Sequence, residues 1–143
     1  IIKNNEKNET IIEYFDNEIK TAIKWITDNL DHNEIGKKHG NDVSLFEGTI
    51  RIVGGLLSAY HLSNNEYPIL LEKCKHISDL LMHAYNTGYE TNIPFSSVNI
   101  RSKRGLNPSW TATSTSTSEA ASIQLEYNYL SYLTKNNEYS MKT

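Results

Sequence analysis

The chain has 143 residues and a formal net charge of −3, and 38% of its residues are hydrophobic. This length suffices for one compact domain with a hydrophobic core. The acidic balance lacks the basic footprint of a nucleic-acid-binding domain, so we expect no nucleic-acid partner. No apolar run approaches the roughly 20 residues that span a bilayer. The chain starts without a signal-like segment, and we expect it to begin inside a longer protein.

The first ten residues are polar and Asn-rich, so we expect residues 1–10 to form a poorly ordered lead-in. Hydrophobic residues then recur every three or four positions, which predicts an amphipathic helix over Thr10–Leu30. The next stretch, Asp31–Asp42, contains two Gly together with Asn and Lys. This composition predicts a loop.

A second helix is predicted over Leu45–Leu62, followed by a turn at Ser63–Glu66. Pro68 suits the first turn of a third helix, which we expect to end near Tyr85. Cys74 lies on the apolar side of this helix and is the only cysteine, so no internal disulfide is possible. We expect it to be a buried core thiol.

The stretch Asn86–Ser118 lacks helical periodicity, and only Ser97–Arg101 alternates as a strand would. Loops of this length in a compact domain are usually functional. Its Ser/Thr-rich end, Thr111–Ser118, fits either a linker or a substrate-side loop. Further helices are predicted over Glu119–Leu133 and from Glu138 to Met141. Together the elements predict an all-α fold of antiparallel helical hairpins with one long loop.

One face of the second predicted helix combines a charged pair with small groups. Spacings of three, four and seven residues bring its members into one sector: Glu47, Arg51, Gly54, Gly55 and Ser58. The opposite sectors are hydrophobic: Leu45, Ile50, Val53, Leu57 and Tyr60. Each Gly costs about 1 kcal/mol relative to Ala in a helix interior. We expect the close approach of a ligand or another backbone to offset that cost.

Two acidic residues in this pattern also have structural explanations. The sequence from Ser44 to Glu47 fits a capping box, and Glu47 and Arg51 stand in the favourable i,i+4 order. On spacing alone, these explanations are favoured for Glu47. The sequence from Ser116 to Glu119 is a second capping-box pattern.

The five histidines form no metal-binding pattern. His76 and His83 are seven residues apart and could share a helix face, but no i,i+4 pair and no carboxylate completes a site. Solvated or packing histidines are expected.

The segment from Asp42 to Leu62 resembles the region around the first catalytic glutamate of class I α-1,2-mannosidases, glycoside hydrolase family 47. Further similar elements follow in the family's order: Ile93-Pro94, Ser96–Ile100, Trp110-Thr111, Ser118–Tyr127 and Leu130–Thr134. The resemblance implies an (α/α)7 barrel, in which helical hairpins close into a toroid. Residues 1–143 would then be a fragment of a single catalytic domain and supply well under half of the barrel.

The resemblance implies that Glu47 is the general acid. Breaking an α-mannosidic bond requires a proton on the leaving oxygen, and burial helps a carboxyl to stay protonated. Arg51 would oppose this effect, so we expect it to orient a carboxylate or bind sugar hydroxyls. The family is inverting, and its general base lies beyond Thr143.

Three further residues match family positions near the sugar. Glu119 matches a glutamate that lines the sugar site and is expected to bind substrate. Glu126 is expected either to pair with another site group or to contact the sugar itself. Ser96 aligns with a position near the aglycone sugar.

These expectations predict a mannosyl-oligosaccharide 1,2-alpha-mannosidase that trims terminal α-1,2-linked mannose from N-linked high-mannose glycans. The fragment alone is expected to be inactive. The alternative is a mannosidase-like glycan-recognition protein of the ER degradation branch, which shares the Glu-x-x-Ile-Arg and Gly-Gly-Leu-Leu-Ser-Ala elements. A helical-repeat scaffold without a sugar site would explain the helices but not the charged, glycine-rich face.

The resemblance also implies a cofactor and a location. Family members bind Ca²⁺ through a Thr near the domain's C-terminus, which lies outside this chain, so no metal ligand is expected here. Residence in the secretory pathway, in the endoplasmic reticulum or Golgi, is implied, with a type II membrane topology for the full-length protein.

Overall fold

The computed structural model describes residues 2–31, 33–88, 92–109 and 113–143. The chain divides into two compact units, residues 1–30 and residues 31–143. Helices dominate both units, which confirms the predicted all-α class, with one small sheet in the second unit. None of the described helices has the length and apolarity needed to cross a membrane.

The first unit is a single helix, α1 (Ile2–Asn29). It confirms the predicted helix and continues it back to Ile2, through the segment expected to be a lead-in. Once a helix has nucleated, each added residue gains a hydrogen bond at little further cost. The Asn-rich segment therefore continues the helix in spite of its composition.

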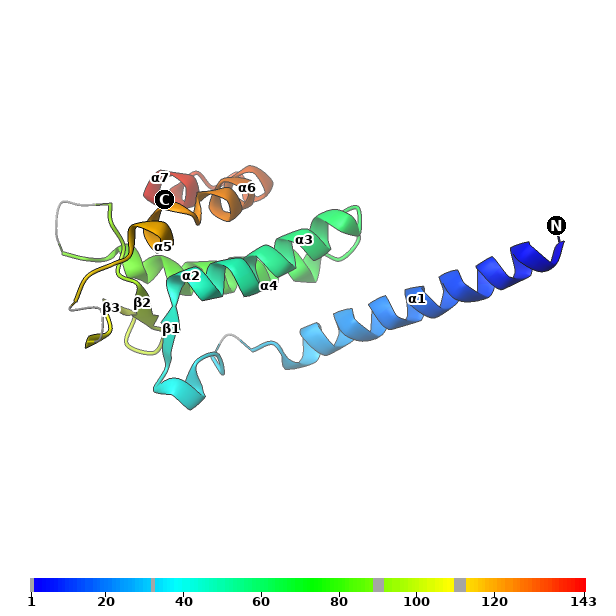
Figure 1. Cartoon of the computed structure of the whole chain (residues 1–143), viewed down its shortest axis with the longest axis horizontal. Helices are drawn as coiled ribbons and strands as arrows, with labels where there is room; N and C mark the ends of the chain where they lie inside the picture. The colour runs from blue at the N-terminus through cyan, green and yellow to red at the C-terminus, as the bar shows by residue number, and fades with distance from the viewer. Residues whose placement is uncertain (1, 32, 89–91, 110–112) are drawn as a thin grey trace. The chain divides into compact units, whose positions relative to one another are not determined.

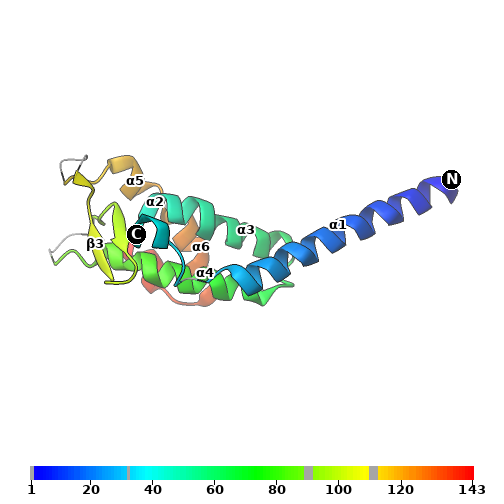
Figure 2. The same ribbon diagram turned by 90° about the horizontal axis from the view of Figure 1, so that it is seen from below.

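The second unit opens with a 3₁₀ turn, η1 (Lys37–His39), in the segment predicted to be a loop, and a short strand, β1 (Asp42–Ser44), begins at the end of that segment. A continuous helical rod follows: α2 (Leu45–Glu47), the π-helical segment η2 (Gly48–Val53) and α3 (Gly54–Leu62). After a short turn, α4 (Pro68–Leu81) returns alongside the rod (Figures 1 and 2). This pair is the predicted helical hairpin.

The rod confirms the predicted second helix, but its π-helical centre was not predicted. The Gly54 amide donates to the Thr49 carbonyl five residues back, the bond that defines a π turn. Thr49 has no exposed surface, whereas Ile50, one of the hydrophobic residues expected opposite the Glu47 sector, is 39% exposed. The wider turn rotates these residues away from the positions that a 3.6-residue period assigns to them.

A three-stranded antiparallel sheet in the order β1-β2-β3 sits beside the start of the rod. β2 (Ser97–Asn99) confirms the first part of the predicted strand, and β3 (Arg104–Leu106) follows a tight turn. Ser44 pairs with Ser97, which aligns β1 with β2. Strands of three residues are too short to show an alternating pattern, so β1 and β3 were missed.

The C-terminal part contains three short helices. The 3₁₀ segment η3 (Met82–Tyr85) extends α4 to its predicted end, and α7 (Glu138–Lys142) confirms the last helix. The helix predicted over Glu119–Leu133 is instead divided into α5 (Thr117–Ala121) and α6 (Gln124–Thr134). At the break, the Ser122 hydroxyl donates to the Ser118 carbonyl at 2.6 Å. Such local side-chain bonds compete with the regular helical ladder.

The core of the second unit is centred on Tyr127, which has no exposed surface. Its ring stacks on Tyr139 with 6.3 Å between centroids. Its hydroxyl oxygen lies 3.4 Å from the Thr49 hydroxyl oxygen. Burial raises the pKa of Tyr127, so the phenol stays neutral. The other fully buried large side chains come from the rod, the sheet, α4, α6 and the break before α6: Leu45, Val53, Leu70, Leu81, Val98, Ile123 and Leu130.

Cys74 should be chemically inert in the folded chain. The thiol is fully buried, as predicted, and burial raises its pKa to about 12. Because only the thiolate reacts, and an unperturbed Cys has a pKa of about 8.5, labelling by iodoacetamide at pH 8 should slow by roughly three orders of magnitude relative to the denatured chain. A labelling rate within tenfold of the denatured rate would contradict this packing.

Candidate functional site

The start of the rod brings Glu47 to the surface. The Leu45 amide donates to the Ser96 carbonyl at 2.9 Å, and the Glu47 amide donates to the Ser44 hydroxyl at 3.2 Å. The Ser44 half of the predicted capping box is therefore formed. The Glu47 carboxylate does not close the box but pairs with Arg51 one turn later.

The Glu47–Arg51 pair is open to solvent, with 48% of the Glu47 side chain and 73% of the Arg51 side chain exposed. The Arg51 Nε donates to Glu47 Oε2, and this hydrogen bond holds the pKa of Glu47 below its usual value. The same bond raises the pKa of Arg51. In this arrangement Glu47 is a carboxylate near neutral pH. It can donate a proton only if Arg51 turns to another acceptor or if burial raises its pKa.

The two glycines that follow Arg51 are not required by the packing of this chain. A Cβ atom at Gly54 would lie 3.5 Å from Glu126 Oε1, an ordinary contact, and one at Gly55 would meet nothing within 4 Å. The close approach predicted for this face is therefore not made by the backbone of any described segment outside the rod. The small residues leave open space instead.

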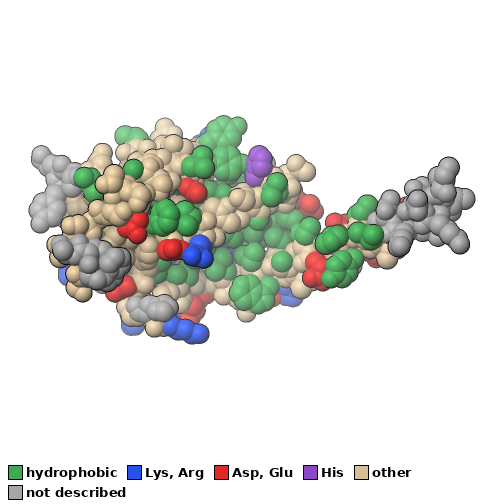
Figure 3. Space-filling model, viewed as in Figure 1, with side chains coloured by type: hydrophobic (Ala, Val, Ile, Leu, Met, Phe, Trp, Pro, Cys, Tyr) green, Lys and Arg blue, Asp and Glu red, His purple; other side chains and the backbone are tan. Residues whose placement is uncertain are grey.

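That space is a groove of about 470 Å³ between α3 and α6. Its lining is mostly apolar: Gly54, Leu57, Ser58, His61, Leu62, Leu125, Glu126 and Tyr129. Figure 3 shows hydrophobic side chains gathered over α3 and α6 on the face in view. His61 Nδ1 lies 2.7 Å from the Tyr129 hydroxyl, which links the two helices. The groove therefore offers aromatic and aliphatic surface beside one carboxylate.

Glu126 is the acidic residue in the groove. Its Oε2 atom is buried and, among the described residues, has no hydrogen-bond partner. Buried carboxylate oxygens are normally paired, because desolvating them without a partner is unfavourable. From the sequence, Glu126 was expected either to pair with another group or to contact the sugar. The described residues provide no such partner for its buried oxygen.

Ser96 lies buried behind the start of the rod. Its amide and its hydroxyl both donate to Asn107 Oδ1, at 2.8 and 3.1 Å. The Thr115 hydroxyl donates to the same oxygen at 3.2 Å, and Asn107 Nδ2 donates to the Thr113 carbonyl at 2.7 Å. Asn107 therefore holds three parts of the long loop together. Sequence reasoning missed this role, and the Asn-Pro pair, which favours a turn, was the only local signal.

Glu119 lies on α5 and, with Ser96, lines a small depression next to Phe46 that is packed too tightly to hold a water molecule. The capping-box pattern from Ser116 to Glu119 is not formed, since the Ser116 hydroxyl lies 2.9 Å from the Ser118 hydroxyl and makes no cap bond. The structure thus brings Ser96 and Glu119 together beside the residue that precedes Glu47. Glu126 lies farther along the rod, beside Gly54.

No group of three or more His, Cys, Asp or Glu in the described part of the chain could hold a metal ion. His32 and the Trp110-Thr111 element lie outside the described residues.

Residues 10–143 match the model of glycosyl hydrolase family 47. The endoplasmic reticulum mannosyl-oligosaccharide 1,2-alpha-mannosidase of Rattus norvegicus is 46% identical over 117 residues, which cover 82% of this chain and 16% of that protein. A mannosyl-oligosaccharide 1,2-alpha-mannosidase of Arabidopsis thaliana is 40% identical, over 89% of this chain and 21% of that protein. The endoplasmic reticulum enzyme of that name from Saccharomyces cerevisiae is 37% identical, over 87% of this chain and 22% of that protein. This chain spans about a fifth of the length of such relatives.

The Glu47–Arg51 pair leads to a prediction about the pKa of Glu47. Because Arg51 lowers the Glu47 pKa, carbon-13 NMR of the Glu47 carboxyl should show a midpoint below the usual Glu value of about 4.3. Any stability that the pair contributes is present above the unfolded-state pKa and is lost as the pH falls through the folded-state value. In an Arg51→Met chain the midpoint should return toward the usual value. An identical midpoint in both chains would show that the pair does not persist in solution.

Removing the charge of Glu126 should not destabilise the chain. Glu126→Gln replaces a carboxyl whose buried oxygen lacks a partner, so urea unfolding should give an unchanged free energy or a gain of up to about 1 kcal/mol. The exposed residue Glu66, changed to Gln, is the matched control. A loss of about 1–3 kcal/mol specific to Glu126→Gln would instead indicate a paired structural carboxylate.

Proposed function

The chain belongs to glycosyl hydrolase family 47, and we propose that it forms part of the catalytic domain of a mannosyl-oligosaccharide 1,2-alpha-mannosidase. The observation that carries the proposal is the exposed Glu47–Arg51 pair at the capped start of the rod, next to the open small-residue face. The substrate is terminal α-1,2-linked mannose on N-linked high-mannose glycans. The names of the rat and yeast relatives support residence in the endoplasmic reticulum, within the secretory pathway.

Glu47 is the proposed general acid. Its proton passes to the glycosidic oxygen as the bond from that oxygen to the anomeric carbon breaks. Water attacks the anomeric carbon from the opposite face of the sugar and gives up a proton to a base from another part of the protein. Inversion at the anomeric carbon follows. Of the residues proposed for the site here, none is assigned to the base.

Arg51 is proposed to change partners when the sugar arrives. In the free chain its hydrogen bond lowers the pKa of Glu47. A sugar hydroxyl that accepts from the guanidinium would release Glu47, and the covering substrate would reduce its contact with water. Both changes raise the pKa of Glu47 toward the range in which it can act as an acid. Arg51 is thereby a substrate-binding residue that couples occupancy of the site to the protonation of Glu47.

Glu119, Ser96 and Glu126 are the proposed substrate contacts beyond the reacting bond. Glu119 and Ser96 share the depression beside Phe46, and the Glu126 carboxylate can accept from sugar hydroxyls in the groove. Ca²⁺ is proposed as a cofactor of the whole domain, as the family resemblance implies, with ligands not assigned to residues of this chain. The glycan-recognition alternative lacks the catalytic step, so turnover distinguishes the two functions.

A chimera tests the acid role. The residues of this chain that match the rat enzyme would replace their counterparts in it, and release of mannose from a high-mannose glycan would be measured. Glu47→Gln keeps the size of the side chain but removes the proton, so kcat should fall by about 10² to 10⁴-fold, the usual contribution of general acid catalysis. Glu66→Gln, the same chemical change on an exposed turn, should stay within about twofold.

The glycan affinity of the chimera separates the catalytic role from a structural one. Glu47→Gln should leave glycan binding and the thermal midpoint near those of the parent chimera. Turnover within a few-fold of the parent would remove Glu47 from the acid role. The 143-residue chain by itself, with Ca²⁺ supplied, should release no mannose, because an inverting displacement also needs a base on the far face of the sugar.

A further inference from the structure

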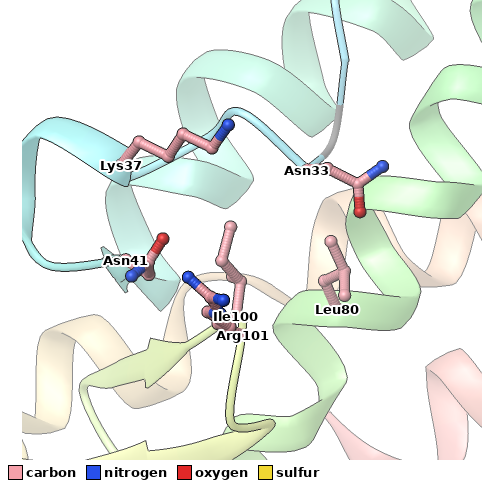
Figure 4. A pocket seen from close by; sticks show the side chains of 6 residues that line it. All are labelled: Asn33, Lys37, Asn41, Leu80, Ile100 and Arg101. Carbon is pink, nitrogen blue, oxygen red and sulfur yellow. The ribbon is translucent and has the colours of Figure 1, made fainter.

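A second cavity, of about 310 Å³, lies beside η1 and the turn that follows β2. Figure 4 shows the six side chains that line it: Asn33, Lys37, Asn41, Leu80, Ile100 and Arg101. Two of them are cations, two are amides and two are aliphatic. No acidic residue is among them. A concave surface lined by one sign of charge concentrates ions of the opposite sign.

The backbone around Asn41 builds one wall of this cavity. Asn41 adopts a left-handed conformation, with φ of 68°, which Asn tolerates better than most residues. Its amide donates to the Gly36 carbonyl at 2.8 Å, and its carbonyl accepts from the Ile100 amide at 3.0 Å. These two bonds tie the loop after η1 to the end of β2. Asn41 and Arg101 are thereby held on neighbouring segments.

The two cations of the cavity are available for a ligand. Arg101 makes no ion pair or hydrogen bond with the residues that the structure describes. Lys37 pairs with Glu34, but the two side chains are 53% and 57% exposed. Exposed pairs of this kind contribute little, so an anion in the cavity can compete for Lys37. Two further cations, Lys103 and Arg104, follow on the same hairpin and add to the positive field.

We propose that this cavity binds a phosphate or sulfate group. The planar guanidinium of Arg101 can donate two parallel hydrogen bonds to such a group, and Lys37 supplies a point charge. The Asn41 side-chain amide makes no hydrogen bond with the residues that the structure describes, so it adds a neutral donor. Leu80 and Ile100 form an apolar surface that suits the body of an ester. High-mannose glycans carry no such charge, so this site is distinct from the proposed mannosidase site and does not rest on it.

NMR titration of the nitrogen-15-labelled 143-residue chain tests the site. Inorganic phosphate and methyl phosphate would be added separately, with sodium chloride adjusted to hold the ionic strength constant. We expect saturable shifts confined to the amides around Lys37, Asn41 and Arg101. Arg101→Gln should weaken binding by about tenfold, because it removes a charge-assisted donor pair. Arg104→Gln, which removes the same charge outside the cavity, should change binding by less than about twofold.

The two probes distinguish the possible sources of the ligand. Tighter binding of methyl phosphate assigns the site to an ester, and tighter binding of inorganic phosphate assigns it to the free ion. Linear, unsaturated shifts would overturn the proposal. Equal weakening by Arg101→Gln and Arg104→Gln would overturn it as well, since that result means general attraction to a basic surface. Lys37→Gln, which should also weaken binding, provides a second variant, and unchanged shifts in α3 and α4 confirm that each variant is folded.

Discussion

The fold around the candidate site depends on how the rod begins. The antiparallel pairing of Ser44 with Ser97 brings the Ser96 carbonyl to the Leu45 amide. The Ser44 hydroxyl accepts a hydrogen bond from the Glu47 amide. The first amides of a helix have no partners within it, so these two bonds fix where the rod starts. The Ser96 amide and hydroxyl both donate to Asn107, which connects Ser96 to the rest of the long loop. Sheet, loop and helix start are therefore one hydrogen-bonded unit, and Glu47 projects from it.

The π-helical turns of η2 are stabilised by the core. π-Helical turns are rare and are found mainly at functional sites. Here the Thr49 hydroxyl donates to the Leu45 carbonyl at 2.8 Å, the carbonyl that the Thr49 amide would bond in a regular α-helix. The same hydroxyl reaches Tyr127 in the middle of the core. The packing of Tyr127 is thus coupled to the turn that carries Arg51, and a change in the core would move one partner of the Glu47–Arg51 pair.

Sequence periodicity predicted the helices well where they are regular. It failed where a side-chain hydrogen bond or a tertiary contact determines the backbone conformation. The hydrophobic period found α4, but it could not reveal the π-helical segment η2, because no 3.6-residue period contains a π turn. The hydrophobic period also predicted one continuous helix through Ser122. The chain instead breaks there, and the Ser122 hydroxyl donates to the Ser118 carbonyl. Of the site residues, Glu47 and Arg51 could be paired from spacing alone. The meeting of Ser96 with Glu119 could not, since it depends on contacts between distant segments.

Several features of the groove between α3 and α6 are unfavourable for the stability of the fold. Gly54 and Gly55 weaken a helix without being needed for packing, Leu62 and Leu125 are 80% and 77% exposed, and Glu126 buries an unpaired oxygen. Such departures concentrate where function, rather than stability, has set the residues. An apolar surface alone could not cover this groove well, because it would desolvate the carboxylate further without pairing it. Whatever occupies the groove therefore has to bring apolar surface to the leucines and a hydrogen-bond donor to Glu126. A sugar, with its apolar ring face and its hydroxyls, meets both requirements.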